Sequence, residues 1–152
     1  KKDDFMGKAA LEAMRDAGKQ RKKVTIEWNR DDVMKVMMSS FEPGLAYKWI
    51  DFPNHNYSSS NADELLKDGK SVGMSMFNGY SYNERCLLSL AVVDADVEVG
   101  DVLTLKWGEA ENSGKTSIEP HQQCEVRVKV APTPYAADAR DNYADSWRTK
   151  AK

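Results

Sequence analysis

The sequence predicts a mainly β, α+β domain: a small six-stranded antiparallel barrel or jelly-roll-like sheet with two or three appended helices. Three observations support this prediction. The chain has 152 residues, which suits a single hydrophobic core. Helix-like apolar spacing dominates the first 40 residues, apart from one alternating run. From residue 63 onward, short apolar or alternating runs are separated by turn residues, as in a small barrel or sandwich.

The first elements are two helices separated by a strand. Residues 5–17 are rich in Ala, Leu, Met and Glu and favour a helix, which Gly18 ends as a C-cap. Residues 23–28 alternate and contain β-branched side chains, so they predict a strand. Asn29 is the expected N-cap of the second helix, which should end before Pro43.

Residues 41–61 combine aromatic side chains with a run of serines. The aromatic residues imply packing, and the serines imply a surface loop. A loop of this length is often functional. It could equally cover another domain.

The second half of the chain consists of strands. Asp68-Gly69 supplies the positive φ angles of a tight turn and therefore predicts a hairpin. In residues 122–130, apolar and charged side chains alternate. Residues 136–148 are polar and Ala-rich and predict a surface helix. The expected strands are residues 64–67, 70–77, 85–93, 101–107 and 122–130.

Composition bears on partners and compartment. The net charge is −2, which gives no indication of nucleic-acid binding. Without an apolar run of about 18 residues or a signal peptide, we expect no membrane contact. Cys86 and Cys124 are interpreted as buried thiols in a reducing cytoplasm, although a disulfide stays open. The chain begins with Lys inside a helix-like pattern, so we expect a piece of a longer protein.

Residues 107–117 (WGEAENSGKTS) look like a phosphate-binding loop. That motif needs four residues between its first Gly and the Gly-Lys-Ser/Thr, followed by a helix. Gly108 and Gly114 are separated by five residues, and a strand-like run follows. Glu109 would also repel phosphate. We therefore interpret this segment as the connection of a β-hairpin.

His121 and Cys124 lie three residues apart but do not form a metal motif, because zinc requires four ligands and tighter pairs. We expect His121 to be a surface or edge residue and Cys124 to lie on the apolar face of its strand. No catalytic or metal-binding residue is predicted.

The stretch from Gly79 to Arg85 places two tyrosines, an amide, an acid and an arginine between two apolar strands. Such a turn could bind a ligand or a partner domain. The interpretation favoured by the residues alone is a hairpin whose aromatic rings cover the barrel end. In that interpretation Glu84 pairs with Arg85 on the surface.

Four segments follow one another along the chain: residues 4–11 (DFMGKAAL), 69–81 (GKSVG and GYS), 88–100 (through EVG) and 130–135 (VAPTPY). In order and in register, they resemble the glycine-cleavage T-protein (aminomethyltransferase) superfamily. The chain also departs from the T-protein pattern: Tyr82 replaces the usual proline, and residues 28–60, 117–123 and 143–149 are additions. These departures resemble the tetrahydrofolate-dependent O-demethylases of methoxyarenes.

The resemblance implies the C-terminal part of such an enzyme. It implies a helical connector at 1–22, a barrel domain at 23–135 with an insertion at about 29–62, and a tail at 136–152. Tetrahydrofolate would be the cofactor of the full-length enzyme, and the fragment would need none. The partners would be the N-terminal folate-binding domains of the same chain.

In this family the domain helps to close the folate channel, and no catalytic residue falls in the matching segments. The residues expected at the channel or at the domain contact are Tyr80, Tyr82, Arg85 and Tyr135.

Two other hypotheses remain. The chain could be a stand-alone binding module that uses the aromatic residues 47–57, or a small enzyme that uses Cys86 or Cys124.

Overall fold

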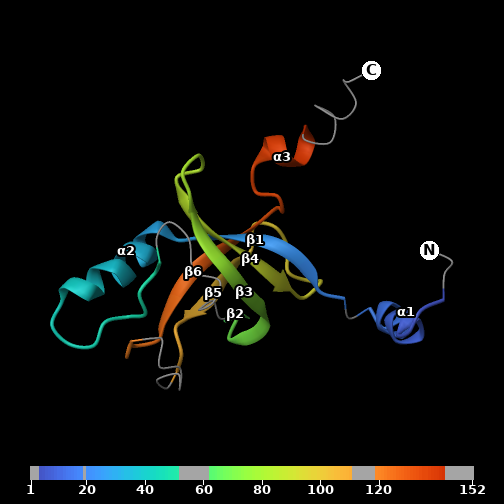
Figure 1. Ribbon diagram of the computed structural model, residues 1–152, viewed down its shortest axis with the longest axis horizontal. Helices are drawn as coiled ribbons and strands as arrows, with labels where there is room; N and C mark the ends of the chain where they lie inside the picture. Colours follow the sequence, from blue (N-terminus) through green and yellow to red (C-terminus); the bar gives the residue numbers. More distant parts are fainter. Residues whose placement is uncertain (1–3, 19, 52–61, 111–118, 143–152) are drawn as a thin grey trace.

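A computed structural model describes residues 4–18, 20–51, 62–110 and 119–142. Six antiparallel strands form a closed barrel in the order β1-β4-β3-β2-β5-β6 (Figure 1). The mainly β barrel predicted from the sequence is confirmed. The strands are β1 (Lys22–Trp28), β2 (Asp63–Lys67), β3 (Lys70–Ser81), β4 (Cys86–Val93), β5 (Val102–Trp107) and β6 (Cys124–Ala131).

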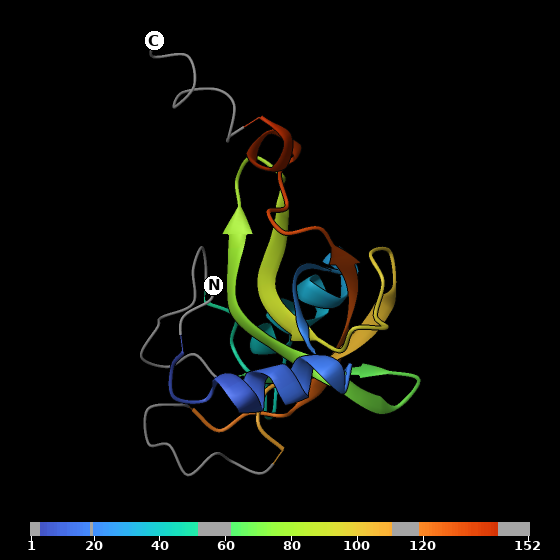
Figure 2. The ribbon, with the colours of Figure 1, turned by 90° about the vertical axis from the view of Figure 1, so that its right-hand side faces the viewer.

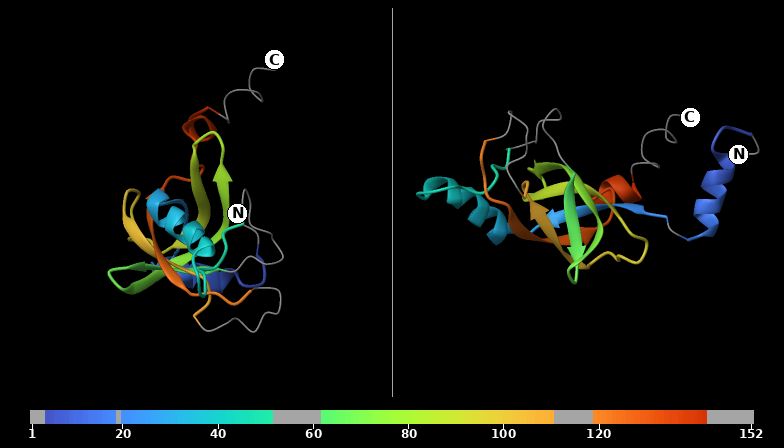
Figure 3. Two further views of the ribbon diagram at one scale, coloured as in Figure 1. Left: turned by 90° about the vertical axis from the view of Figure 1, so that its left-hand side faces the viewer. Right: turned by 90° about the horizontal axis from the view of Figure 1, so that it is seen from below.

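In the part of the chain that the structure describes, three helices lie outside the barrel: α1 (Lys8–Asp16), α2 (Arg30–Met38) and α3 (Ala137–Asp141). A 3-10 turn, η1 (Ser39–Phe41), extends α2. Helices α1 and α2 project from opposite ends of the barrel (Figures 1 and 3). Helix α3 lies on the side of the barrel from which the β3–β4 hairpin projects (Figure 2). In the described ranges, no helix is long and apolar enough to cross a membrane.

Helix α2 begins where the sequence predicts. The Asn29 side chain accepts hydrogen bonds from the backbone N–H groups of Asp31 and Asp32, both at 3.1 Å. These bonds satisfy two of the N–H groups that have no partner within the helix. The two aspartates also place negative charge at the positive end of the helix dipole.

The turn between β2 and β3 also follows the prediction. Asp68 and Gly69 have φ angles of 51° and 76°. Two successive positive φ angles define a turn whose twist matches that of the paired strands. The pair Lys67 and Lys70 closes this hairpin.

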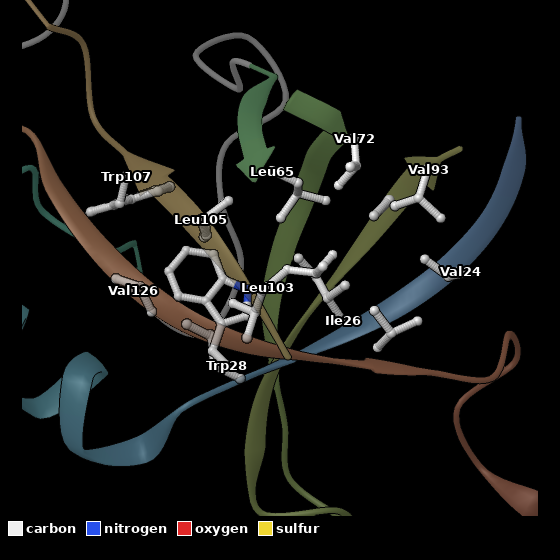
Figure 4. Close-up of a cluster of buried hydrophobic side chains, with 14 of the residues drawn as sticks. Val24, Ile26, Trp28, Leu65, Val72, Val93, Leu103, Leu105, Trp107 and Val126 are labelled. Atoms are coloured by element: carbon white, nitrogen blue, oxygen red, sulfur yellow. The ribbon is translucent and has the colours of Figure 1, made fainter. Parts of the chain in front are cut away.

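The barrel interior is filled by alternate residues of every strand (Figure 4). On β6, Val126, Val128 and Val130 are almost fully buried, as the alternation predicts. Trp28 and Trp107 meet edge to face, with ring centroids 5.2 Å apart. The other buried apolar side chains of the strands are Val24, Ile26, Leu65, Val72, Leu87, Ala91, Val93, Leu103, Leu105 and Ala131.

The segment before residue 52 closes one end of the barrel. Ile50 is fully buried, and the Trp107 Nε1–H donates a hydrogen bond of 2.7 Å to the Lys48 carbonyl. Tyr47 forms a parallel bridge with Gln122 and is half-buried. Of the described aromatic residues in this segment, Tyr47 packs against the core, whereas Phe41 and Trp49 are exposed, so the prediction that they pack is confirmed for Tyr47 alone. Residues 52–61, the rest of the predicted loop, lie outside the described residues.

Strand β3 is longer than predicted, and the following turn is shorter. Gly79 to Ser81 pair with β4 instead of forming the turn. The register shifts between Met76 and Gly79, where Phe77 has a φ of 54°. A bulge of this kind adds residues to one strand, so the alternation of the sequence does not reveal it.

Strands β5 and β6 are antiparallel neighbours, paired from Val102 with Lys129 to Trp107 with Cys124. This confirms that residues 107–117 belong to a hairpin connection. Residues 111–118 lie outside the described residues. The predicted C-terminal helix is present only over Ala137–Asp141, and its expected extension beyond residue 142 is likewise not described.

Candidate functional site

A groove of about 850 Å³ lies between α2, the β3–β4 hairpin and the barrel wall. Its volume is in the range of protein binding sites. Strands β1 and β6 supply the wall, and α2 supplies one side. The lining residues are Glu27, Trp28, Asn29, Arg30, Val33, Met34, Met37, Tyr80, Glu84, Arg85, Cys86, Leu87, Val102, Arg127, Val128 and Lys129.

Arg127 fixes α2 against the barrel at this groove. Its Nε and Nη2 donate to the two Asp32 carboxylate oxygens, each at 2.8 Å. The Arg127 backbone N–H also donates to Asp32. The side-chain hydrogen bond with Arg127 is the main cause that lowers the pKa of Asp32. The groove wall is therefore pre-formed by a bidentate ion pair.

Two of the four predicted contact residues line the groove: Tyr80 and Arg85. Tyr80 is half-buried and meets Tyr82 edge to face, with centroids 5.6 Å apart. Tyr82 is 77% exposed and does not line the groove. The expected Glu84–Arg85 ion pair is absent from the described residues, and both side chains are exposed. Arg85 has a φ of 55° in this turn.

Tyr135 reaches the groove indirectly. Its hydroxyl donates a hydrogen bond of 2.8 Å to the Glu27 carboxylate, which lines the groove. Burial, followed by this bond to Glu27, raises the pKa of Tyr135. The phenol therefore stays protonated and holds Glu27 in place.

A second group of polar residues lies at the end of β5, and two of its members are buried. Lys48 and His121 are only 4% and 5% exposed. The Lys48 ammonium lies 3.0 Å from Glu109 Oε1 and 4.9 Å from the centre of the Trp107 ring. This polar cluster consists of the buried Lys48 and His121 and the half-buried Asp63 and Glu109, contributed by four separate segments of the chain.

The histidine of the cluster is held by backbone groups. His121 Nδ1 lies 2.9 Å from the Glu119 carbonyl oxygen, and its Nε2 lies 3.0 Å from the Glu109 backbone nitrogen. Glu109 Oε2 is 2.8 Å from the same Nε2 atom. Burial acts to raise the pKa of Glu109, but the hydrogen bond and charge of Lys48, with a contribution from His121, lower it overall.

Asp63 has the most perturbed carboxyl group of the cluster. Burial raises its pKa to about 7, and the nearby Glu109 acts in the same direction. The charge of Lys48 and the Gly108 backbone N–H oppose this shift. Asp63 therefore exchanges its proton near neutral pH.

The prediction that His121 is a surface or edge residue is wrong. The chain turns at Gly108, whose φ is 94°, and the imidazole lies directly against it. A Cβ atom at Gly108 would lie 3.0 Å from His121 Cδ2 and Nε2. The other members of the cluster were also missed, because no spacing in the sequence brings these four residues together. None of the four lines the groove.

The cysteines are free and half-buried. Burial raises the pKa of Cys86, and burial raises that of Cys124 to about 11. A catalytic cysteine needs the opposite shift. In the described part of the chain, no group of three or more His, Cys, Asp or Glu residues is arranged to hold a metal ion.

The fold and the groove thus define a closed β-barrel module with a groove beside a projecting helix. No family model matches the chain. It is 44% identical over 149 residues to a syringate O-demethylase of Sphingobium sp. (strain NBRC 103272 / SYK-6). The aligned region covers 97% of this chain and 32% of that protein. It is 30% identical over 156 residues to a sesamin methylene transferase of Sinomonas sp. (strain No.22), covering 93% of this chain and 32% of that protein. The chain spans about a third of the length of both relatives.

Proposed function

We propose that this chain is the C-terminal barrel domain of a tetrahydrofolate-dependent methyl or aminomethyl transferase, close to the aromatic O-demethylases. The similarity to a syringate O-demethylase along 97% of the chain is the observation that carries this proposal. A demethylase and a methylene transferase both move a one-carbon group. Tetrahydrofolate is the acceptor implied by the T-protein resemblance.

The role of the domain is to pack against the folate-binding remainder of the same polypeptide. Helix α1 supports this role because none of its residues is buried. An amphipathic helix normally buries its apolar stripe. Around α1, four apolar side chains are instead at least half exposed: Phe5, Met6, Leu11 and Met14. Residues 1–22 then act as the connector, 23–135 as the barrel domain and 136–152 as the tail.

Tyr80, Tyr82, Arg85 and Tyr135 are assigned to the contact that closes the folate channel against water. The exposed Tyr82 ring, which meets Tyr80 edge to face, offers an aromatic surface to the neighbouring domain. Arg85 adds a charged group beside it. The hydroxyl of Tyr135 is occupied by Glu27, so this residue presents its ring.

The domain has no catalytic role by itself in this proposal. Both thiols have raised pKa values, which disfavours the alternative of a small cysteine enzyme. Free half-buried thiols also suit a reducing cytoplasm.

Calorimetric titration with tetrahydrofolate tests the division of roles. We expect the full-length polypeptide to bind the cofactor and the 152-residue chain to bind it weakly or not at all. Submicromolar binding by the 152-residue chain alone would contradict the proposal. The O-demethylase activity of the full-length polypeptide on methoxyarenes tests the reaction class separately.

A further inference from the structure

We propose that the groove between α2 and the β3–β4 hairpin receives an acidic, apolar-faced surface from the remainder of the same polypeptide. Arg30 and Arg85 would pair with its carboxylates. This inference rests on the proposed function, and it names the surface and the chemistry of the partner.

The apolar surface extends beyond the groove. Met34 lines the groove and is 50% exposed, and Met38, one helical turn later, is 51% exposed. Phe41 of η1 continues the strip and is 78% exposed. Contiguous exposed apolar surface of this kind marks a protein contact, whereas a small molecule would cover only the groove.

Arg30 is placed where helix stability disfavours it. It is the first residue of α2, at the positive end of the helix dipole. A cation there is unfavourable, and acidic residues are preferred. Arg30 is exposed and forms no hydrogen bond or ion pair with a residue in the described ranges.

Arg85 is likewise placed against local preference. Its φ of 55° is left-handed, a conformation that costs a residue with a side chain about 1 kcal/mol or more. The exposed guanidinium has no partner within the part of the chain that the structure describes. A partner outside this chain would provide carboxylates for both arginines, and this pairing would explain two positions that local structure disfavours.

The balance of charge on the groove indicates an acidic partner. Arg127 is already neutralised by Asp32. The other charged residues that line the groove are the cations Arg30, Arg85 and Lys129 and the anions Glu27 and Glu84, so cations exceed anions by one. Arg30 and Arg85 come from opposite sides of the groove, and neither has an ion-pair partner in the described ranges. Arginine binds carboxylates bidentately, so two such side chains select both position and charge.

The relatives favour the same polypeptide as the source of this partner. This chain corresponds to 32% of each relative, so about two thirds of such a protein lies outside it. A surface carried by the same polypeptide has a high effective concentration and requires only a modest intrinsic affinity.

Methionine footprinting with hydrogen peroxide tests the proposal by mass spectrometry. Met34 and Met38 report on the groove side, and Met6 and Met14 report on α1. In the full-length polypeptide we expect Met34 and Met38 to oxidise about tenfold more slowly than in the 152-residue chain. Protection of Met6 and Met14 without protection of Met34 would overturn this inference and leave the proposed function standing.

If none of the four methionines is protected, the proposed function fails together with the inference. Protection of Met34 that grows with the concentration of the 152-residue chain alone would assign the groove to a second copy and overturn the proposal.

Charge reversal tests the arginines. In the full-length polypeptide, the double change Arg30→Glu and Arg85→Glu should restore rapid oxidation of Met34 and Met38. The control Lys70→Glu, at the exposed first residue of β3, should not. Circular dichroism verifies that each variant folds. The milder double change Arg30→Gln and Arg85→Gln should increase the oxidation of Met34 and Met38 by a smaller factor. Full protection in both arginine variants would overturn the proposed pairing.

Discussion

Asp63 shows how the barrel end controls a single proton. Its carboxyl lies near the ammonium of Lys48, but burial and the charge of Glu109 prevail and raise its pKa to about 7. In the unfolded chain the group has an ordinary pKa near 3.8. Below about pH 4 both states hold the proton, and its contribution to folding is complete. Between about pH 4 and pH 7 the unfolded chain releases this proton and the folded state keeps it, so unfolding is favoured by rising pH and stability falls.

We therefore expect Asp63→Asn to reduce the pH dependence of the free energy of unfolding between pH 4 and pH 7. Relative to the parent chain, the variant should gain about 4 kcal/mol between pH 4 and pH 7, because one pKa unit corresponds to about 1.4 kcal/mol. Urea unfolding at a series of pH values measures this difference. Asp68→Asn, in the exposed β2–β3 turn, is the matched control and should give a constant difference. A parallel profile for Asp63→Asn would show that Asp63 is not the titrating group.

Gly73 allows a close approach between strands. A Cβ atom there would lie 2.3 Å from the Val92 carbonyl oxygen and 2.9 Å from Val93 Cα. Because both are backbone atoms, β4 would have to move. We expect Gly73→Ala to lower the free energy of unfolding by about 3 kcal/mol, measured by urea denaturation. Ser71→Ala, two residues earlier and exposed, should change it by less than about 0.5 kcal/mol.

The residue scale is where sequence-based prediction is weakest. Nothing in the sequence around His121 or Lys48 distinguishes a buried polar residue from an exposed one. Their burial depends on four segments that meet only after the barrel closes. The contact residues Tyr80, Tyr82, Arg85 and Tyr135 remain a prediction, although Tyr80 and Arg85 do border the groove.

At the element scale, a chain of hydrogen bonds links three strands through the core. Trp28 Nε1–H on β1 donates to Ser89 Oγ on β4 at 2.9 Å. The Ser89 hydroxyl is also 2.9 Å from Ser75 Oγ on β3. All three side chains are buried, so each relies on this chain of contacts for its polar group.

We expect Ser89→Ala to destabilise the protein by about 2 kcal/mol, because it leaves the Trp28 N–H and the Ser75 hydroxyl without that partner. Chemical denaturation followed by circular dichroism measures the effect. Ser40→Ala, exposed in η1, serves as the control and should be nearly neutral. Equal stability of the two variants would show that the network contributes nothing net.

The elements were predictable where local chemistry determines them. The side chain of Asn29 favours a helix N-cap, and the backbone preferences of Asp68-Gly69 favour a tight turn. The bulge near Phe77 was not predictable, because phenylalanine seldom adopts a positive φ and does so here under tertiary constraint. Similarly, the sequence predicted α2 but not its position opposite the β3–β4 hairpin, because that position depends on residues about 50 positions apart in the chain.

At the scale of the whole molecule, α1 stands apart from the barrel. We expect removal of residues 1–17 to change the free energy of unfolding by less than about 0.5 kcal/mol, since no α1 residue is buried. Thermal and urea unfolding test this. Ile50→Ala is the positive control: it opens a cavity at the barrel end and should cost about 3 kcal/mol. A large loss on removing α1 would mean that the helix contributes to the core after all.

The barrel class followed from alternation and turn spacing, which report local burial. The order of the strands around the barrel could not be predicted, because a single sequence contains no signal for which distant strands pair. Function came mostly from resemblance, since a fold by itself does not determine chemistry.

Closure of the sheet has a consequence for recognition. In the closed part of the barrel each strand is bonded on both sides, so a visiting peptide finds no row of vacant amides and carbonyls there along which to align as a seventh strand. Only the projecting end of the β3–β4 hairpin differs among the described strands, because Gly79–Ser81 pair with β4 and not with β2. A partner of the closed part must therefore be recognised through side-chain shape and charge. Changes at a few surface positions could then retune its choice of partner while the barrel backbone stays the same.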